Sequence, residues 1–228
     1  MTDDLDNLGP VSRKALEALR SFGRPMTTSE ITELGVSRAI LSNLIAAGYI
    51  DRPVRGVYLL PSEDDDQRVF WACISLACDG VFCLTSAALY YGLTEENAGR
   101  PHVAILRDAR VPDKKSLDIS VDFHRWPDAA LEQDIERIGI QGVQVKITSP
   151  ARTIVDMFRH SLLNTDRRFQ RVIAEDTFLD ALSRYLESND QDTKTRELHR
   201  VASKHGCWEQ ISARATVINA TRDRMRVR

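Results

Sequence analysis

Residues 27–58 constrain the fold more than any other stretch, because two short helical patterns there are each bounded by recognisable start and stop residues. Residues 27–30, Thr-Thr-Ser-Glu, have the spacing of a capping box, which starts a helix. Gly35 can adopt the left-handed conformation that ends this helix and turns the chain. Ser37 is then the expected N-cap of a second helix, and Gly48 is its expected end. The pattern predicts two helices joined by a tight turn.

Further elements flank this pair of helices. Before it, residues 11–22 place apolar side chains on one helical face, with Ser12 as the expected N-cap. After it, residues 54–58 predict a β-hairpin with Gly56 at its turn. Three helices followed by a hairpin predict a winged helix-turn-helix domain over residues 1–60. The usual role of this fold is to place one helix in the major groove of DNA.

The third predicted helix has an apolar face and a polar face. Its apolar positions, which should pack against the other two helices, are Ile40, Leu41, Leu44 and Ile45. The opposite face carries Arg38, Ser42 and Asn43, whose side chains can reach base edges or phosphates. Arg52 and Arg55 flank the hairpin, where phosphate or minor-groove contacts are expected. Winged helices also serve as protein-contact domains, so that alternative stays open at this point.

The charge of the predicted N-terminal domain is balanced. Residues 1–60 contain seven Lys or Arg and seven Asp or Glu, and the whole chain has a formal net charge of −2. A composition of 43% hydrophobic and 28% charged residues is typical of a folded chain rather than a disordered one. Because no general basic field is available to attract nucleic acid, DNA binding must depend on where individual arginines lie.

The sequence also bears on location and on metal binding. No apolar run approaches the roughly 20 residues that span a bilayer, and the acidic N-terminus lacks a secretory signal pattern, so we expect a cytoplasmic protein without a membrane partner. The four cysteines of the chain are Cys73, Cys78, Cys83 and Cys207, and no two of them have CxxC spacing. We expect them to be buried small hydrophobic residues rather than zinc ligands.

A second domain is predicted over residues 67–228. The acidic stretch at residues 61–66 is its expected boundary, and an apolar helix follows at residues 69–77. Four short β-rich runs come next, at residues 102–106, 119–123, 135–138 and 143–147. From about residue 149 the pattern is helical, with Ser149 as a cap and Pro150 at the first helical position. We therefore predict an α+β fold: a winged helix-turn-helix, then a mixed α/β domain with a helical C-terminal region.

Three local features of the second domain are also predicted. Thr85 or Ser86 should cap a helix that ends near Gly92. Arg152 and Asp156 lie four residues apart on one helical face, where they could pair. The arginines of the last seven residues predict a basic tail, and they are Arg222, Arg224, Arg226 and Arg228.

Motifs of catalysis are largely missing from the sequence. It contains no P-loop, GxGxxG, GxSxG or HExxH motif. The main enzymatic alternative is a PD-(D/E)xK-like nuclease, in which carboxylates and a lysine converge on a magnesium ion, and Asp122 on one strand with Lys146 on another has a faint likeness to that arrangement. Gln144 stands where a second carboxylate is needed, which weakens that interpretation. We expect a protein that is not an enzyme and that uses no cofactor or metal.

The sequence resembles the AbiEi-type antitoxins of type IV toxin–antitoxin systems, which act in phage defence. The resemblance starts at GVSRAILSNLIAAGYIDRPVRGVYLLP and continues in VFCLTSAALYYGLT and RELHRVASKHG. It is most specific in TSPARTIVDMFRH, with a Ser-Pro-x-Arg-Thr-x-x-Asp pattern. The resemblance implies a repressor that binds repeated promoter sequences of its own operon, and a C-terminal domain that counteracts a nucleotidyltransferase-like toxin by contact or by functional antagonism. A monomer that assembles cooperatively on the promoter DNA fits this arrangement.

The resemblance also implies site residues. DNA-binding roles carry over to Thr28, Ser29, Ser37, Arg38, Ser42, Asn43, Arg52 and Arg55. In the C-terminal domain only a candidate patch of Arg152, Thr153 and Asp156 carries over, and a buried structural Arg–Asp pair is the favoured alternative there. A stand-alone winged-helix transcription factor with a sensing or oligomerisation domain is the second hypothesis for the whole chain.

Overall fold

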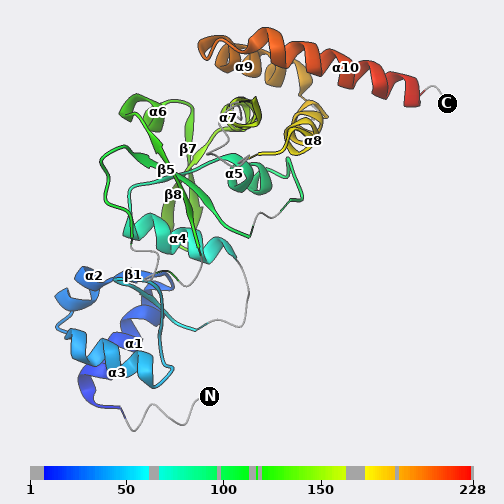
Figure 1. Ribbon diagram of the computed structural model, residues 1–228. Helices are drawn as coiled ribbons and strands as arrows, with labels where there is room; N and C mark the ends of the chain where they lie inside the picture. The colour runs from blue at the N-terminus through cyan, green and yellow to red at the C-terminus, as the bar shows by residue number, and fades with distance from the viewer. Residues whose placement is uncertain are drawn as a thin grey trace. The chain divides into compact units, whose positions relative to one another are not determined.

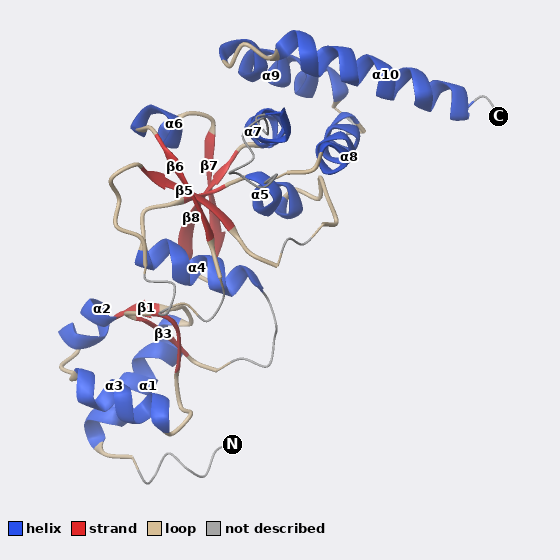
Figure 2. Ribbon diagram, in the orientation of Figure 1, coloured by secondary structure: helices blue, strands red, loops and turns tan. Residues whose placement is uncertain are grey.

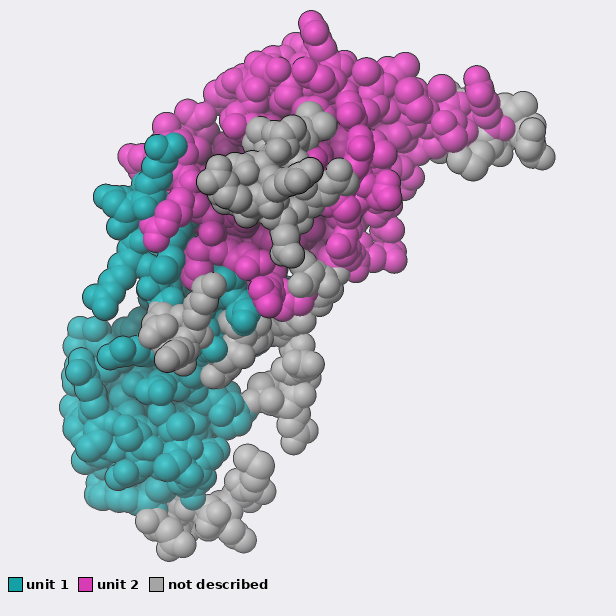
Figure 3. All heavy atoms as spheres, viewed as in Figure 1, with its two compact units in different colours: residues 1–80, 105–121, 137–146 teal, residues 81–104, 122–136, 147–228 magenta. Residues whose placement is uncertain are grey.

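The computed structural model describes residues 8–61, 67–96, 99–112, 117, 120–162, 173–187 and 190–226 (Figure 1). Helices and strands are both well represented, and the C-terminal part is helical (Figure 2). The α+β fold class is therefore confirmed. The chain forms two compact units, each built from several segments (Figure 3). Unit 1 comprises residues 1–80, 105–121 and 137–146, and unit 2 comprises residues 81–104, 122–136 and 147–228.

Unit 1 begins with a winged helix-turn-helix. Its helices are α1 (Pro10–Phe22), α2 (Thr28–Glu33) and α3 (Arg38–Ala46), and its strands are β1 (Met26–Thr27), β2 (Asp51–Val54) and β3 (Val57–Leu59). The strands form an antiparallel sheet in the order β1-β3-β2. Strand β1 was not predicted, because two residues carry no alternation pattern and their pairing partners, Tyr58 and Val57, are some thirty positions away.

The predicted helix boundaries hold where side chains cap the helix. The Glu30 backbone N–H donates to Thr27 Oγ1 over 3.3 Å, and the Thr27 N–H donates to Glu30 Oε2 over 2.7 Å, which completes a capping box. Ser37 Oγ accepts from the Ile40 N–H over 3.4 Å at the start of α3. The prediction of Ser12 as the cap of α1 is wrong, because the helix starts two residues earlier with Pro10 as its first residue.

The core of the winged helix consists of residues from all three helices and the wing. Its buried members are Ala15, Leu16, Leu19, Met26, Ile31, Val36, Leu41, Leu44, Ile50 and Tyr58. Ile40 and Ile45 are only partly buried against this core. Helix α4 (Gln67–Ala77), which we predicted to open the second domain, packs against all three strands of the wing sheet within unit 1. The wing is therefore supported from outside residues 1–60. The acidic stretch predicted as the boundary lies outside the described residues from 62 onward.

A five-stranded sheet has the order β6-β5-β4-β8-β7. Its strands are β4 (Val81–Phe82), β5 (His102–Leu106), β6 (Asp122–Trp126), β7 (Ile135–Ile140) and β8 (Val143–Thr148). Strand β4 occupies the centre and pairs antiparallel with β5, although at two residues it was too short to predict. Strand β6 starts later than the predicted run at residues 119–123, of which residue 119 lies outside the described part.

Unit 2 contains the remaining helices. They are α5 (Leu84–Tyr90), α6 (Asp128–Glu132), α7 (Pro150–Leu162), α8 (Glu175–Leu186), α9 (Gln191–Lys204) and α10 (Trp208–Arg226). Helix α7 packs against α5, α8 and α9. Helix α5 is not capped by Thr85 or Ser86, since it starts at Leu84 and its N-cap residue is Cys83. The predicted basic tail is helical as far as Arg226, and Arg222 donates to Glu187 Oε1 over 2.6 Å.

Within the described residues, no helix is both long and apolar enough to cross a membrane.

Candidate nucleic-acid interface

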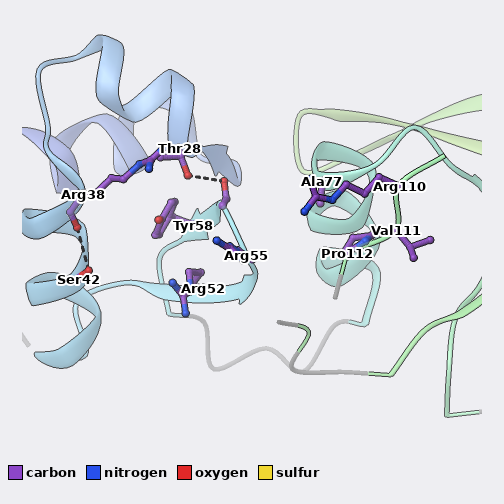
Figure 4. A pocket seen from close by; sticks show the side chains of 11 residues that line it. Thr28, Arg38, Ser42, Arg52, Arg55, Tyr58, Ala77, Arg110, Val111 and Pro112 are labelled. Atoms are coloured by element: carbon purple, nitrogen blue, oxygen red, sulfur yellow. Dashed lines mark hydrogen bonds between the residues drawn. The ribbon is translucent and has the colours of Figure 1, made fainter. Parts of the chain in front are cut away.

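A concave pocket of about 760 Å³ lies in unit 1, beside helix α3 and the wing (Figure 4). It is lined by Thr28, Arg38, Ser42, Arg52, Arg55, Gly56, Tyr58, Ala77, Arg110, Val111 and Pro112. We call it the arginine pocket, because four of these side chains are arginines and none is acidic. Five of the residues expected to contact DNA line it, and they are Thr28, Arg38, Ser42, Arg52 and Arg55.

Helix α3 lines the pocket with side chains from its first two turns. Arg38 is the first residue of α3, and Ser42 follows one turn later on the same exposed face. Ser42 Oγ donates to the Arg38 carbonyl over 3.1 Å, which leaves the hydroxyl oxygen free to accept a hydrogen bond. In Figure 4 the Arg38 side chain extends from α3 toward Thr28. A long donor-bearing side chain at the start of a recognition helix is well placed to reach base edges.

The wing is fixed to the start of α2 by Thr28. Its backbone N–H donates to the Gly56 carbonyl over 2.8 Å, and its Oγ1 donates to the same carbonyl over 3.2 Å. Gly56 has a φ of +87°, and a Cβ atom there would lie 3.4 Å from Thr28 Oγ1. The turn therefore requires glycine both for its conformation and for the close approach of Thr28. This contact holds Arg55, the residue before Gly56, in a fixed place relative to the helices.

The arginines of the pocket are available to a ligand. Arg38, Arg52, Arg55 and Arg110 are all exposed, and within the described part of the chain none of them forms an ion pair. By contrast, Arg24 of the same domain is held by Glu30, with 2.5 Å between Nη2 and Oε1. Four unpaired positive charges around one concave surface attract a polyanion.

Three of the residues expected to contact DNA do not line the pocket. They are Ser29, Ser37 and Asn43. The Ser37 side chain caps α3, so its hydroxyl is used in holding the helix. Ser29 and Asn43 are exposed at the surface of α2 and α3. A role of these three in DNA binding stays a prediction.

Arg110 is a member of the pocket that sequence reasoning missed. It follows strand β5, more than fifty residues after the wing, and its neighbours Val111 and Pro112 also line the pocket. No local pattern marks Arg110, because its position depends on pairing between distant segments. One such pairing is an antiparallel β-bridge between Val54 of the wing and Leu117.

The candidate patch of the C-terminal domain is buried rather than on the surface. Arg152 and Asp156 are each 1% exposed, and Thr153 is fully buried. Arg152 Nε donates to Asp156 Oδ2 over 2.7 Å, and its Nη1 donates to the Gln133 carbonyl over 3.3 Å. The guanidinium also lies over the Trp126 ring, 5.0 Å from its centroid. These side chains therefore hold α7 in unit 2 and cannot contact a partner at the surface.

Burial also affects the ionisation of this pair. It raises the pKa of the Asp156 carboxyl, an effect that the adjacent Arg152 guanidinium opposes. The thiol of Cys83, which is fully buried, has a pKa raised by burial and by the charge of Asp156. Burial also raises the pKa of Cys73 to about 12. These thiols are therefore small core residues, as expected, and not nucleophiles.

Three histidines that the sequence did not single out form a cluster in unit 2. His102 Nδ1 and His124 Nε2 are 2.9 Å apart, and the rings of His124 and His160 meet edge to face with 5.7 Å between centroids. Burial lowers the pKa of His102, and it lowers that of His124 to about 3. His102 and His124 are therefore neutral at pH 7. Among the described residues, no group of His, Cys, Asp and Glu is arranged to hold a metal ion.

The residues of the nuclease alternative are not brought together. Asp122 is on β6 and Lys146 on β8, and strands β5 and β4 lie between these two in the sheet. Lys146 Nζ pairs with Asp79 over 2.8 Å, and Asp122 lies 3.9 Å from Arg100. The structure therefore does not support the nuclease alternative at this pair, because two strands separate Asp122 from Lys146.

Two comparisons with known proteins found a match, one to a family model and one to a solved structure. Residues 13–61 match a family model described as a transcriptional regulator, AbiEi antitoxin, which confirms the predicted resemblance over that segment. The crystal structure of the RV2827C protein from Mycobacterium tuberculosis has a similar fold, with a TM-score of 0.59 and 15% sequence identity. The alignment covers 92% of this chain and 78% of that one. No curated protein matched the sequence.

Proposed function

We propose that this chain is a DNA-binding antitoxin that represses its own operon through the winged helix. One observation carries the DNA-binding half: exposed arginines from α3 and the wing, without an ion pair to any described residue, line one pocket whose described lining residues include no acidic one. The match of residues 13–61 to AbiEi antitoxin regulators supports the same conclusion. The chain acts by binding, without catalysis of its own, in the cytoplasm where its operon lies.

Helix α3 enters the major groove in this proposal. Arg38, at its first position, contacts a base edge or the adjacent phosphate, and the Ser42 hydroxyl oxygen accepts a hydrogen bond one turn further on. Arg52 and Arg55 of the wing contact phosphates beside the groove. Backbone contacts of this kind set the register of the protein on the duplex, and α3 supplies the sequence preference.

The balanced charge of the N-terminal domain is compatible with this binding. Glu30 is engaged by Arg24 and by the capping box, and the carboxylates of residues 17, 33 and 51 do not line the pocket. Three of the seven positive side chains of residues 1–60 therefore line the pocket and none of the described acidic ones does, although the sum of charges over residues 1–60 is zero. Short-range arrangement decides the local potential, since charges more than about 10 Å apart are screened at 0.1 M salt.

A mobility-shift titration with the DNA upstream of the gene tests this proposal. We expect a shift that weakens with salt and is reduced in Arg38→Ala, because a direct contact to the duplex is removed. Arg20→Ala is the matched control, since Arg20 is an exposed arginine of α1 that does not line the pocket. Absence of any shift at low salt would contradict the proposal.

We propose that the C-terminal domain, residues 67–228, counteracts a neighbouring nucleotidyltransferase-like toxin. The support for this half is the resemblance of the sequence and the description of the matching family. Co-expression of the full chain with the neighbouring gene should restore growth, and Arg38→Ala should restore it equally well when both genes are driven from a foreign promoter. Failure to restore growth would favour a stand-alone transcription factor whose second domain senses a ligand or mediates oligomerisation.

A further inference from the structure

We propose that Arg110, outside the predicted winged-helix domain, binds a backbone phosphate of the same DNA duplex that α3 reads. This inference rests on the proposed DNA-binding function and adds a second, separate segment to the interface. It changes the boundary of the DNA-binding surface, because a truncated chain ending at residue 60 would lack this contact.

The placement of Arg110 supports this role. Arg110, Val111 and Pro112 line the arginine pocket together with Arg52 and Arg55 of the wing, and all belong to unit 1. In the view of Figure 4, α3 lies on one side of the wing, and Ala77 with residues 110–112 lies on the other. A duplex that receives α3 in its major groove extends past the wing, so further phosphates are available on that side.

The segment that carries Arg110 is connected to the wing by structure. Helix α4, whose last residue Ala77 lines the pocket, packs on the three wing strands. Val54 of β2 forms a β-bridge with Leu117, and the Ala109 N–H donates to the Leu106 carbonyl over 3.2 Å in the turn before Arg110. Arg110 is therefore presented from a defined position rather than from a free arm, which lowers the entropic cost of contact.

The chemistry of the pocket favours a phosphate chain over a small ligand. Its four guanidinium groups carry more positive charge than one phosphate group can offset, whereas a duplex presents one negative charge per about 1.7 Å of its axis. Val111, Pro112 and Ala77 beside Arg110 have no side-chain donor or acceptor that could hydrogen-bond to a base edge. Arg110 is exposed and, among the described residues, forms no ion pair that must first be broken.

The test is the salt dependence of binding for Arg110→Gln, which removes the charge, and for Arg110→Lys, which keeps it. The probes are a 30-base-pair duplex from the upstream DNA and a shuffled duplex of the same composition. Loss of one phosphate contact makes the negative slope of log K against log salt shallower by about 0.9. The affinity for the duplex at 0.1 M salt should then fall about eightfold. We expect this change in Arg110→Gln on both probes, and a slope close to wild type in Arg110→Lys.

Arg107→Ala is the matched control, because Arg107 is an exposed arginine of the same segment that does not line the pocket. It should bind like wild type. If wild type binds with a clear salt slope and Arg110→Gln matches it, the role of Arg110 is overturned while the proposed function stands. If Arg110→Gln loses affinity on the upstream duplex alone, the contact is to a base and the inference is also overturned. If wild type binds neither probe, the result contradicts the proposed DNA-binding function, and the role of Arg110 is rejected with it.

Discussion

Arg38 and Arg152 were both singled out from the sequence, and the structure places them in opposite environments. Arg38 is exposed at the start of α3, where it lines the arginine pocket and forms no ion pair with any described residue. Arg152 is 1% exposed and satisfied by Asp156, Gln133 and Trp126. An arginine that is already satisfied stabilises the fold, and one that is unsatisfied is available to a ligand. The pairing of the guanidinium, rather than the residue type, separates the two roles.

The largest effect is expected from breaking the buried pair. Arg152→Ala should lower the free energy of unfolding by about 3–5 kcal/mol, because it leaves Asp156 as an uncompensated buried charge. Urea denaturation measures this loss. Arg159→Ala on the same helix is the control, because the Arg159 side chain is 44% exposed and its Nη1 lies as far as 3.8 Å from Asp156 Oδ1. Its loss should lower the free energy of unfolding by less than about 1 kcal/mol. Equal stability of Arg152→Ala and wild type would show that the pair is not structural.

Partly buried histidines of unit 2 predict a pH dependence of stability. A free histidine has a pKa of about 6.5, and burial lowers that of His124 to about 3. Between these values the unfolded chain binds a proton that the folded chain does not. The free energy of unfolding should therefore fall as the pH decreases from 6.5, by at most about 1.4 kcal/mol per pH unit from His124, or about 2 kcal/mol by pH 5. His205, with a pKa lowered by burial to about 4, acts in the same direction.

Denaturation of wild type and of His124→Gln at pH 7, 6 and 5 measures this contribution. The variant should lose less stability between pH 7 and 5 than wild type does, because one titrating group is removed. DNA binding by the winged helix should be unchanged at pH 7. A steeper loss in the variant would contradict the assignment.

DNA affinity and the free energy of unfolding can both be measured in one variant of Arg38. Arg38→Ala should weaken DNA binding by roughly 1–2 kcal/mol, about tenfold, through loss of a contact to the duplex. Its free energy of unfolding should stay within about 0.5 kcal/mol of wild type, since Arg38 is exposed. Comparison of a denaturation curve with a binding titration distinguishes this from a folding defect. A variant that is destabilised but binds normally would reverse the roles assigned to Arg38.

The smallest effect is expected at Ser37, which is both a predicted DNA contact and an observed cap. Ser37→Ala should destabilise the domain by about 1 kcal/mol, because the Ile40 N–H loses its acceptor at 3.4 Å. Ser37→Asp restores the cap and should recover the stability. If Ser37→Ala instead weakens binding at full stability, the serine contacts DNA directly.

Local signals in the sequence were reliable where one element determines the outcome. The capping box of Thr27 and Glu30 and the N-cap at Ser37 were predicted correctly, because each is formed by groups only three residues apart in the sequence. The spacing of Arg152 and Asp156 likewise predicted their ion pair. A buried structural pair was also the favoured alternative, and both side chains are 1% exposed. Their other partners, Trp126 and Gln133, were not predicted, because they come from segments nineteen or more residues earlier.

Features built from distant segments were missed for the same reason. Strands β1 and β4 have two residues each, so only their partners identify them as strands. Arg110 joins the arginine pocket through the packing of α4 and the bridge from Val54 to Leu117. The sequence predicted five of the eleven residues that line the pocket, all from the contiguous winged helix.

Four arginines without an ion pair to any described residue form one DNA-binding surface in this proposal, and the salt dependence of binding measures their joint contribution. Affinity for the upstream duplex is measured from 50 to 300 mM salt for wild type and for a variant with Arg38, Arg52, Arg55 and Arg110 all changed to Gln. Each phosphate contact contributes about −0.9 to the slope of log K against log salt, so the slope of the variant should be shallower by about 2.7 if Arg38 contacts a base and by about 3.6 if it contacts a phosphate. An unchanged slope in the variant, or a wild-type protein that does not bind, would contradict the account.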